Sequence, residues 1–267
     1  MKITKKISLS LLCVSTLAVI CQPALAVENG QESQLKSTGN VQFQQDLVTD
    51  PEENNGPLRI ESVTMIDFGI VGIKGDTATY NAIYSENIKE ELLNDAGSLL
   101  ETNFLPLTVQ TADDRGTNQG WQLQVTHSRQ FTELGPDGRM SKADPAILKG
   151  AEINLSVTSV ERPADKQGET TETRPSGLKQ KVNLNDQVKT VVNAQVNEGM
   201  GTWQSLFGEK VSAVSSPGKD PEGNDVMIPV ENEAVQLTIP GDTVKVKDVM
   251  YQGELTWILI NSPETVS

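Results

Sequence analysis

The sequence predicts an all-β protein, an antiparallel, sandwich-like single domain with long loops and little helix. Short segments in which apolar and polar residues alternate recur roughly every ten residues along the chain. Turn signals separate these segments, and 21 glycines and 13 prolines favour many tight turns. Helical periodicity is weak throughout. The alternative architecture is a pair of small β-units joined by a long exposed loop at residues 161–177.

Alternation and β-branched residues mark each predicted strand. Residues 188–196 would also fit a helical face, but their four valines favour a strand. Residues 86–100 are the one segment where we expect a short helix, since acidic residues lie near its start. The polar turn at 113–120 joins two strands as a hairpin or an arch. In chain order, the predicted strands lie within 58–68, 76–84, 105–109, 121–131, 148–160, 182–184, 188–196, 226–230, 234–239, 244–246 and 250–260.

Residues 1–26 have the pattern of a secretory signal peptide. Three lysines precede an apolar run, and Ala24-Leu25-Ala26 provides a small-x-small cleavage site. Both cysteines, Cys13 and Cys21, lie in this leader, so the mature chain has no thiol or disulfide. The residues before Cys21 do not match a lipoprotein site. Residues 27–56 are polar and read as a flexible segment, and the β-domain is expected over residues 57–267.

The charge of the chain excludes several classes of partner. Its net charge is −14, and loss of the three leader lysines leaves 19 basic against 36 acidic residues, or −17. Such a surface repels nucleic acid and anionic lipid headgroups. No other apolar run is long enough to cross a bilayer, so we expect no membrane insertion after signal cleavage.

Two Trp-x-Leu triplets stand in predicted strands and use two of the three tryptophans in the chain. In the first, Trp121 and Leu123 fall on one face of a strand whose other face is polar. In the second, Trp257 and Leu259 share one face, but the opposite face is apolar too, which predicts a strand covered on both sides.

This pair of motifs resembles the signature of the WxL family of cell-surface proteins from Gram-positive bacteria. The resemblance runs from about Asp50 to the end of the chain and lies behind an export signal. The matching stretches are Asp67-Phe68-Gly69, Asp114-Arg115-Gly116 with Gly120-Trp121-Gln122-Leu123, Gly199-Met200-Gly201-Thr202-Trp203, and Tyr251, Leu255, Trp257, Leu259 and Pro263.

The resemblance implies a secreted protein held non-covalently on the bacterial surface by peptidoglycan. It also implies surface complexes with other cell-surface proteins, or contact with host surface proteins. The candidate binding residues are then Trp121, Leu123, Tyr251, Trp257 and Leu259. Alternating Trp and Leu on a strand are by default core residues, and Tyr251 could simply close the edge of the domain. We expect the two motif strands to lie close together, with leucines packed inward and tryptophans shaping a face suited to a sugar ring.

Two acidic loops could offer calcium several oxygen ligands, namely Asp113-Asp114 with Asn118, and residues 220–225. Neither has EF-hand spacing, and exposed acidic turns are common in so acidic a chain. We therefore expect no metal and no cofactor.

Catalytic residues are not expected either. His127 is the only histidine, and pairing it with Ser128 and an aspartate would be required for a Ser-His-Asp arrangement. No nucleophile elbow accompanies these residues. Paired carboxylates of a glycosidase remain an unspecific alternative among 36 acids. The sequence therefore favours a binding protein over an enzyme. The alternative to glycan binding is a surface-complex subunit or adhesin whose motifs bind a protein.

Overall fold

The computed structural model describes residues 33–40, 56–94 and 96–261. Apart from one short 3-10 helix, the described elements are β-strands, so the all-β prediction is confirmed. In chain order they are β1 (Ser33–Asn40), β2 (Leu58–Val63), β3 (Ile66–Asp67), β4 (Ala78–Ile83), β5 (Lys89–Leu93), β6 (Leu99–Phe104), β7 (Leu107–Asp113), β8 (Trp121–Glu133), β9 (Glu152–Leu155), β10 (Ser159–Glu161), η2 (Ala164–Lys166), β11 (Gly177–Leu178), β12 (Val182–Leu184), β13 (Lys189–Ala194), β14 (Gly201–Phe207), β15 (Ser215–Lys219), β16 (Asp225–Pro229), β17 (Glu231–Ile239) and β18 (Tyr251–Ile260).

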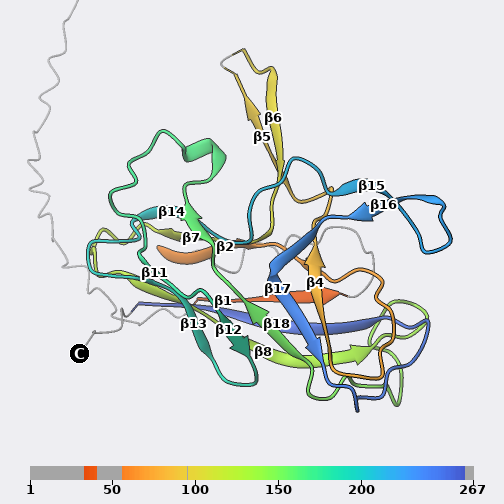
Figure 1. The fold of residues 1–267 in the computed structure, drawn as a ribbon. Helices are drawn as coiled ribbons and strands as arrows, with labels where there is room; N and C mark the ends of the chain where they lie inside the picture. The colour runs from red at the N-terminus through yellow and green to blue at the C-terminus, as the bar shows by residue number, and fades with distance from the viewer. Residues whose placement is uncertain (1–32, 41–55, 95, 262–267) are drawn as a thin grey trace, which may run out of the picture.

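The larger sheet has ten strands in the order β11-β13-β8-β18-β1-β3-β4-β17-β9-β12. It curls until its two edges approach each other (Figure 1). The backbone N–H of His127 in β8 donates to the carbonyl of Asn185, just after β12, at 3.2 Å. The N–H of Val157, just after β9, donates to the carbonyl of Lys179, just after β11, at 3.1 Å. The sheet is therefore a half-barrel that surrounds one side of the core.

The smaller sheet, β10-β14-β7-β2, covers the open side of the half-barrel. Apolar residues of both sheets belong to one buried cluster. At its centre the rings of Phe207 on β14 and Trp257 on β18 meet edge to face, with centroids 5.5 Å apart. The two sheets thus share a single sandwich core, which places the strand that carries the second motif in the middle of the molecule.

Two hairpins, β5–β6 and β15–β16, form small sheets of their own outside the sandwich (Figure 1). The helix predicted at residues 86–100 is therefore wrong. A turn divides this segment, because the carbonyl of Asn94 accepts the N–H of Gly97 at 2.8 Å and Gly97 has a φ of +77°. The base of the hairpin is held instead by tertiary contacts, including the ion pair of Lys210 with Glu90 at 2.5 Å.

Most other strand predictions are confirmed, including β13 within residues 188–196. The strands on either side of the 113–120 turn belong to different sheets, so the connection is an arch. The strand predicted at 244–246 is wrong. The backbone N–H of Val246 donates to Tyr251 Oη at 2.9 Å and not to a neighbouring strand, and the side chain of Lys245 folds back to donate to the carbonyl of Pro240 at 2.9 Å.

One strand lies in the segment that the sequence indicated to be flexible. β1 pairs antiparallel with β18 and parallel with β3 inside the large sheet. The signal-peptide prediction for residues 1–26 lies outside the described residues, as do residues 27–32 and 41–55. In the part of the chain that the structure describes, no helix is long and apolar enough to span a membrane.

Candidate functional site

The two motif strands, β8 and β18, are direct neighbours in the large sheet and run antiparallel. Leu123 lies opposite Leu259, and Val125 lies opposite Trp257. The expectation that the two motifs come together is confirmed. In this register the two Trp-x-Leu triplets project their large side chains onto the same face of the sheet, toward the smaller sheet.

Burial on that face is nearly complete. Trp121 is 1 % exposed, Trp257, Leu123 and Leu259 are 0 % exposed, and Tyr251 is 6 % exposed. The leucines pack inward as expected. The expectation that the tryptophans present a face to solvent is wrong, because Trp257 packs against Phe207 of the second sheet and Trp121 lies against Gly199 in the connection before β14. These five residues build the core behind the sheet and do not form an open sugar-stacking platform.

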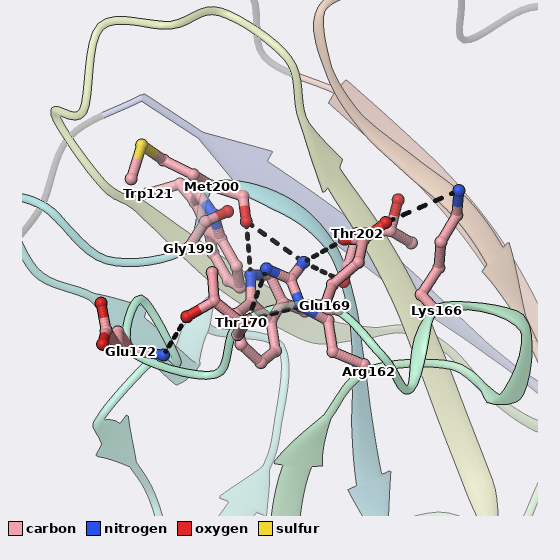
Figure 2. Close-up of polar contacts among 10 residues, drawn as sticks. Trp121, Arg162, Lys166, Glu169, Thr170, Glu172, Gly199, Met200 and Thr202 are labelled. Atoms are coloured by element: carbon pink, nitrogen blue, oxygen red, sulfur yellow. Dashed lines mark hydrogen bonds and ion pairs between the residues drawn. The ribbon is translucent and has the colours of Figure 1, made fainter.

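Trp121 is fastened to the Gly-x-Gly-x-Trp stretch on the other side of the sandwich. Its indole Nε1–H donates to the carbonyl of Gly199 at 3.0 Å (Figure 2). Gly199 has a φ of +80°, and a Cβ there would lie 2.3 Å from Trp121 Nε1. Glycine at this position therefore serves both the backbone conformation and the close approach of the ring.

Arg162 closes the same end of the sandwich by stacking on a third tryptophan. Its guanidinium carbon lies 3.9 Å from the ring centroid of Trp203, and the side chain is 6 % exposed. Its nitrogens donate to the carbonyls of Thr202 at 2.8 Å, Thr170 at 3.0 Å and Met200 at 3.3 Å (Figure 2). Burial lowers the pKa of Arg162, while the charge of Glu169 raises it. One buried cation thus ties the long 161–177 loop to β14.

Arg115, from the Asp-Arg-Gly of the first motif, connects both motif strands. It donates to Asp113 through Nε at 2.8 Å and Nη2 at 2.7 Å, and to the carbonyl of Gly120 at 2.8 Å. Its Nη1 also donates to Asn261, the residue after β18. The bidentate ion pair orients the guanidinium so that it can reach both strands.

The outward side of the motif strands carries amides and hydroxyls. Gln122 and Gln124 alternate with the buried Trp121 and Leu123, and Gln124 Nε2 donates to Gln122 Oε1 at 3.0 Å. Thr190 of β13 donates to Gln122 at 3.2 Å and accepts from Gln124 at 3.3 Å. Beside them, β18 contributes Thr256, Ile258 and Ile260, with Ile258 opposite Gln124 and Thr256 opposite Thr126. Gln124, Thr126, Thr190 and Ile260 are partly exposed.

In both acidic loops considered for calcium, a carboxylate already accepts hydrogen bonds from other groups of the protein. Both oxygens of Asp113 accept from Arg115. Asp220 accepts from the backbone N–H of Asn224 and from its side-chain amide, each at 2.8 Å, and these contacts lower the pKa of Asp220. Among the described residues, no group of three or more His, Cys, Asp or Glu side chains is arranged to hold a metal ion.

His127 and Ser128 lie on opposite faces of β8. His127 is 4 % exposed, and its ring meets Phe131 edge to face at 5.7 Å. Ser128 is exposed and donates to Glu254 at 3.1 Å. Burial lowers the pKa of His127, against a smaller backbone contribution in the opposite direction. The geometry does not pair this hydroxyl with this imidazole.

The fold and the buried motif residues define a class of protein. It is a single β-domain whose core is built from paired Trp-x-Leu strands. A family model described as "WxL domain surface cell wall-binding" matches residues 30–263. The match spans most of the chain, so the protein belongs to the WxL family, a family of cell-surface domains that bind the cell wall. No curated protein and no solved structure matches the chain significantly.

Sequence reasoning missed the arginine that completes the cluster. Arg162 stands at the start of a charged, Gly- and Pro-containing segment that was interpreted as an exposed loop, and nothing local distinguishes it from the arginines on the surface. Its partner Trp203, the last residue of the Gly-x-Gly-x-Trp stretch, is fully buried. The two residues are 41 positions apart, so only the pairing of β10 with β14 brings them together.

Proposed function

We propose that the chain binds peptidoglycan non-covalently through the outward face of the paired motif strands β8 and β18 and of β13, which pairs with β8. The buried Trp-x-Leu side chains act by fixing the shape of this face and do not themselves contact glycan. The observation that carries the proposal is the direct pairing of the two motif strands, which brings the partly exposed Gln124, Thr126 and Ile260 onto the same side of the sheet. Gln122, Thr256 and Ile258 between them are buried.

The chemistry of this surface suits a polysaccharide. Amides and hydroxyls from Gln124, Thr126 and Thr190 can exchange hydrogen bonds with sugar hydroxyls and N-acetyl groups. The partly exposed Ile260 offers an apolar contact to the C–H face of a sugar ring. A chain of net charge −14 gains no general electrostatic attraction from an anionic wall, so hydrogen bonding and contact must supply the affinity.

The test is a pulldown on peptidoglycan stripped of proteins and teichoic acids. We expect the wild type to bind, and the triple variant Gln124→Ala/Thr126→Ala/Thr190→Ala to lose most of the binding while it stays folded. The matched control is Gln236→Ala/Thr79→Ala/Thr238→Ala, which removes one glutamine and two threonines from the neighbouring strands β4 and β17 of the same sheet. The control should bind like the wild type.

Equal loss in both triple variants would place the binding elsewhere on the sheet, and unchanged binding in both would contradict the assignment to the motif strands. Replacement of Trp121 or Trp257 is not informative about contact, because these side chains are core residues. Loss of binding in such variants is expected to follow loss of the fold.

We further propose that the protein is secreted, that it acts by binding and not by catalysis, and that it takes part in surface complexes or adhesion. The last proposal is supported by the two hairpins that extend from the sandwich as free arms (Figure 1). If the wild type fails to bind purified peptidoglycan, a protein partner becomes the better explanation of how the chain reaches the wall.

A further inference from the structure

A pocket of about 640 Å³ opens between two loops, residues 69–73 and 245–249, and Tyr251 is the one candidate binding residue of the motifs that lines it. Its floor is formed by core side chains of the large sheet, namely Tyr80, Leu237, Ile239 and Tyr251. This volume lies within the range of about 300–1,000 Å³ that is common for pockets that take a ligand.

The rim of the pocket is unusually apolar for a surface loop. Ile70 is 85 % exposed, Ile73 is 57 % exposed and Val246 is 39 % exposed. Lys245, Lys247 and Asp248 line the same rim, with Lys247 3.5 Å from Asp248, and Lys74 Nζ lies 5.8 Å from the ring centroid of Tyr80 on the floor. Three lysines thus face one aspartate around the pocket. The rim therefore combines an apolar opening with cationic side chains, within a chain whose net charge is strongly negative.

A second apolar feature carries charge of the opposite sign. The β5–β6 hairpin projects from the sandwich as a narrow arm (Figure 1). Near its tip, Leu93 and Leu99 are each 57 % exposed and Leu100 is 67 % exposed. Exposed Glu91 and Glu101 flank these leucines. Glu91 pairs with Lys89 at 2.9 Å, which leaves Glu101 as the unneutralised acid of this pair. The arm thus carries apolar side chains with an excess of acid beside them, whereas the pocket is apolar with an excess of lysine at its rim.

The arm and the pocket of one molecule cannot meet. The hairpin projects beyond the far end of β4 and β17, whereas the pocket lies toward the end at which β17 terminates (Figure 1). The arm's base is fixed by the ion pairs of Lys210 with Glu90 and Glu161, and by the pairing of Phe104 with Val211. An arm held in this way points away from its own pocket.

We propose that the leucine-bearing tip of the β5–β6 hairpin occupies the pocket between residues 69–73 and 245–249 of a second copy of the same chain. The contact joins two different surfaces, so it leaves a free arm on one molecule and a free pocket on the other. Such a head-to-tail contact continues into a ring or a chain of molecules. This inference does not rest on the proposed glycan face, whose exposed residues Gln124, Thr126, Thr190 and Ile260 do not line the pocket.

The experiment is sedimentation velocity of the chain from Val27 onward over a concentration series. The wild type should form species larger than a dimer as concentration rises. Leu99→Ser/Leu100→Ser removes the arm contact, and Ile70→Ser/Ile73→Ser removes the pocket contact. All four positions are exposed, so the fold should persist. Each double variant alone should weaken association at least about tenfold.

Mixing the two variants distinguishes this contact from general stickiness. The arm variant keeps an intact pocket and the pocket variant keeps an intact arm, so an equimolar mixture should form a dimer and nothing larger. As a matched control, Met227→Ser/Ile228→Ser removes a similarly exposed apolar pair from β16 and should assemble like the wild type. A wild type that stays monomeric throughout the series, a mixture that does not dimerise, or an equal effect of the control would each overturn the proposal.

Discussion

The two motif tryptophans occupy the same kind of position on neighbouring strands, yet their surroundings differ. Trp257 lies in the middle of the sandwich, where its ring meets Phe207 of the opposite sheet. Trp121 lies where β8 begins, and its indole N–H binds the carbonyl of Gly199 in a loop. One ring joins two sheets by apolar packing, and the other joins a strand to a connection by a buried hydrogen bond.

This difference indicates that a repeated motif can perform two structural tasks. The central ring contributes through the apolar area that it removes from water. The terminal ring contributes through a hydrogen bond whose loss would leave buried polar groups without partners. Around it, Arg162 stacks on Trp203 and binds three loop and strand carbonyls. Removing a side chain should therefore reduce stability most at Trp257. Near Trp121, stability should depend on the glycine and the arginine that hold the surrounding loops.

The largest effect is expected for Trp257→Ala. The ring is 0 % exposed and in contact with the opposite sheet, so its removal leaves a large cavity between the sheets. We expect a loss of about 3–5 kcal/mol in the free energy of unfolding, measured by urea denaturation monitored by circular dichroism. A loss of less than about 1 kcal/mol would mean that the sheets do not share this core.

Gly199→Ala should destabilise the packing and the hydrogen bond of Trp121. The added Cβ would lie 2.3 Å from Trp121 Nε1, and the residue would have to keep a φ of +80°. Strain and the disturbed hydrogen bond together predict a loss of about 2–4 kcal/mol.

Gly116→Ala is the matched control for Gly199→Ala. Its φ of +67° is similar, but a Cβ there meets nothing within 4 Å. It reports the backbone cost alone, about 1–2 kcal/mol. If the two variants lose equal stability by urea denaturation, the close approach to Trp121 contributes nothing.

Arg162→Lys tests the stacking and hydrogen bonds of the buried guanidinium while keeping a positive charge. Lysine cannot stack its charge flat on Trp203 or reach three carbonyls with a planar fork, so we expect a loss of about 1–2 kcal/mol. Arg174→Lys, an exposed position on the same loop, should change stability by less than about 0.5 kcal/mol. Thermal unfolding of both variants beside the wild type gives the comparison, and equal melting temperatures for all three would contradict it.

The sequence predicted those parts of the fold that depend on local pattern. Alternation marks Trp121–Glu133, whereas Tyr251–Ile260 is apolar on both faces and is buried on both over residues 255–259, and both strands were predicted. The segment at residues 86–100 was misassigned because its composition permits a helix, whereas Asn94 and Gly97 form a turn that divides it. Tertiary contacts at the hairpin base then favour strands over local helix propensity.

The candidate site was predictable only in part. The motifs indicated which strands matter and that they lie together. Whether Trp121 and Trp257 face solvent depends on the second sheet, whose position no single strand encodes. The role of Arg162 depends on a non-local pairing of β10 with β14, so its sequence context reads as an ordinary polar loop. Long-range pairing is thus the step that local periodicity cannot supply.

The smallest expected effect concerns His127, which packs on the side of the core away from Trp121. Burial lowers its pKa in the folded protein. The unfolded chain therefore binds a proton more readily, near its ordinary pKa of about 6.5. This contribution to stability is complete above that value and is lost as pH falls toward the lower pKa of the folded state. Only one proton is involved, so the change is small.

The pH effect is measured as the difference in unfolding free energy between about pH 7.5 and about pH 5.5, where the change in His127 dominates. The wild type should be less stable at the lower pH, and His127→Phe should show a smaller difference. Because His127 is the only histidine in the chain, no second imidazole can imitate the effect. Burial raises the pKa of Asp67, which acts in the opposite direction as pH falls, but this carboxyl is present in both proteins and cancels in the comparison. An identical pH difference in both proteins would show that His127 ionises freely and that its ring is not held in the core.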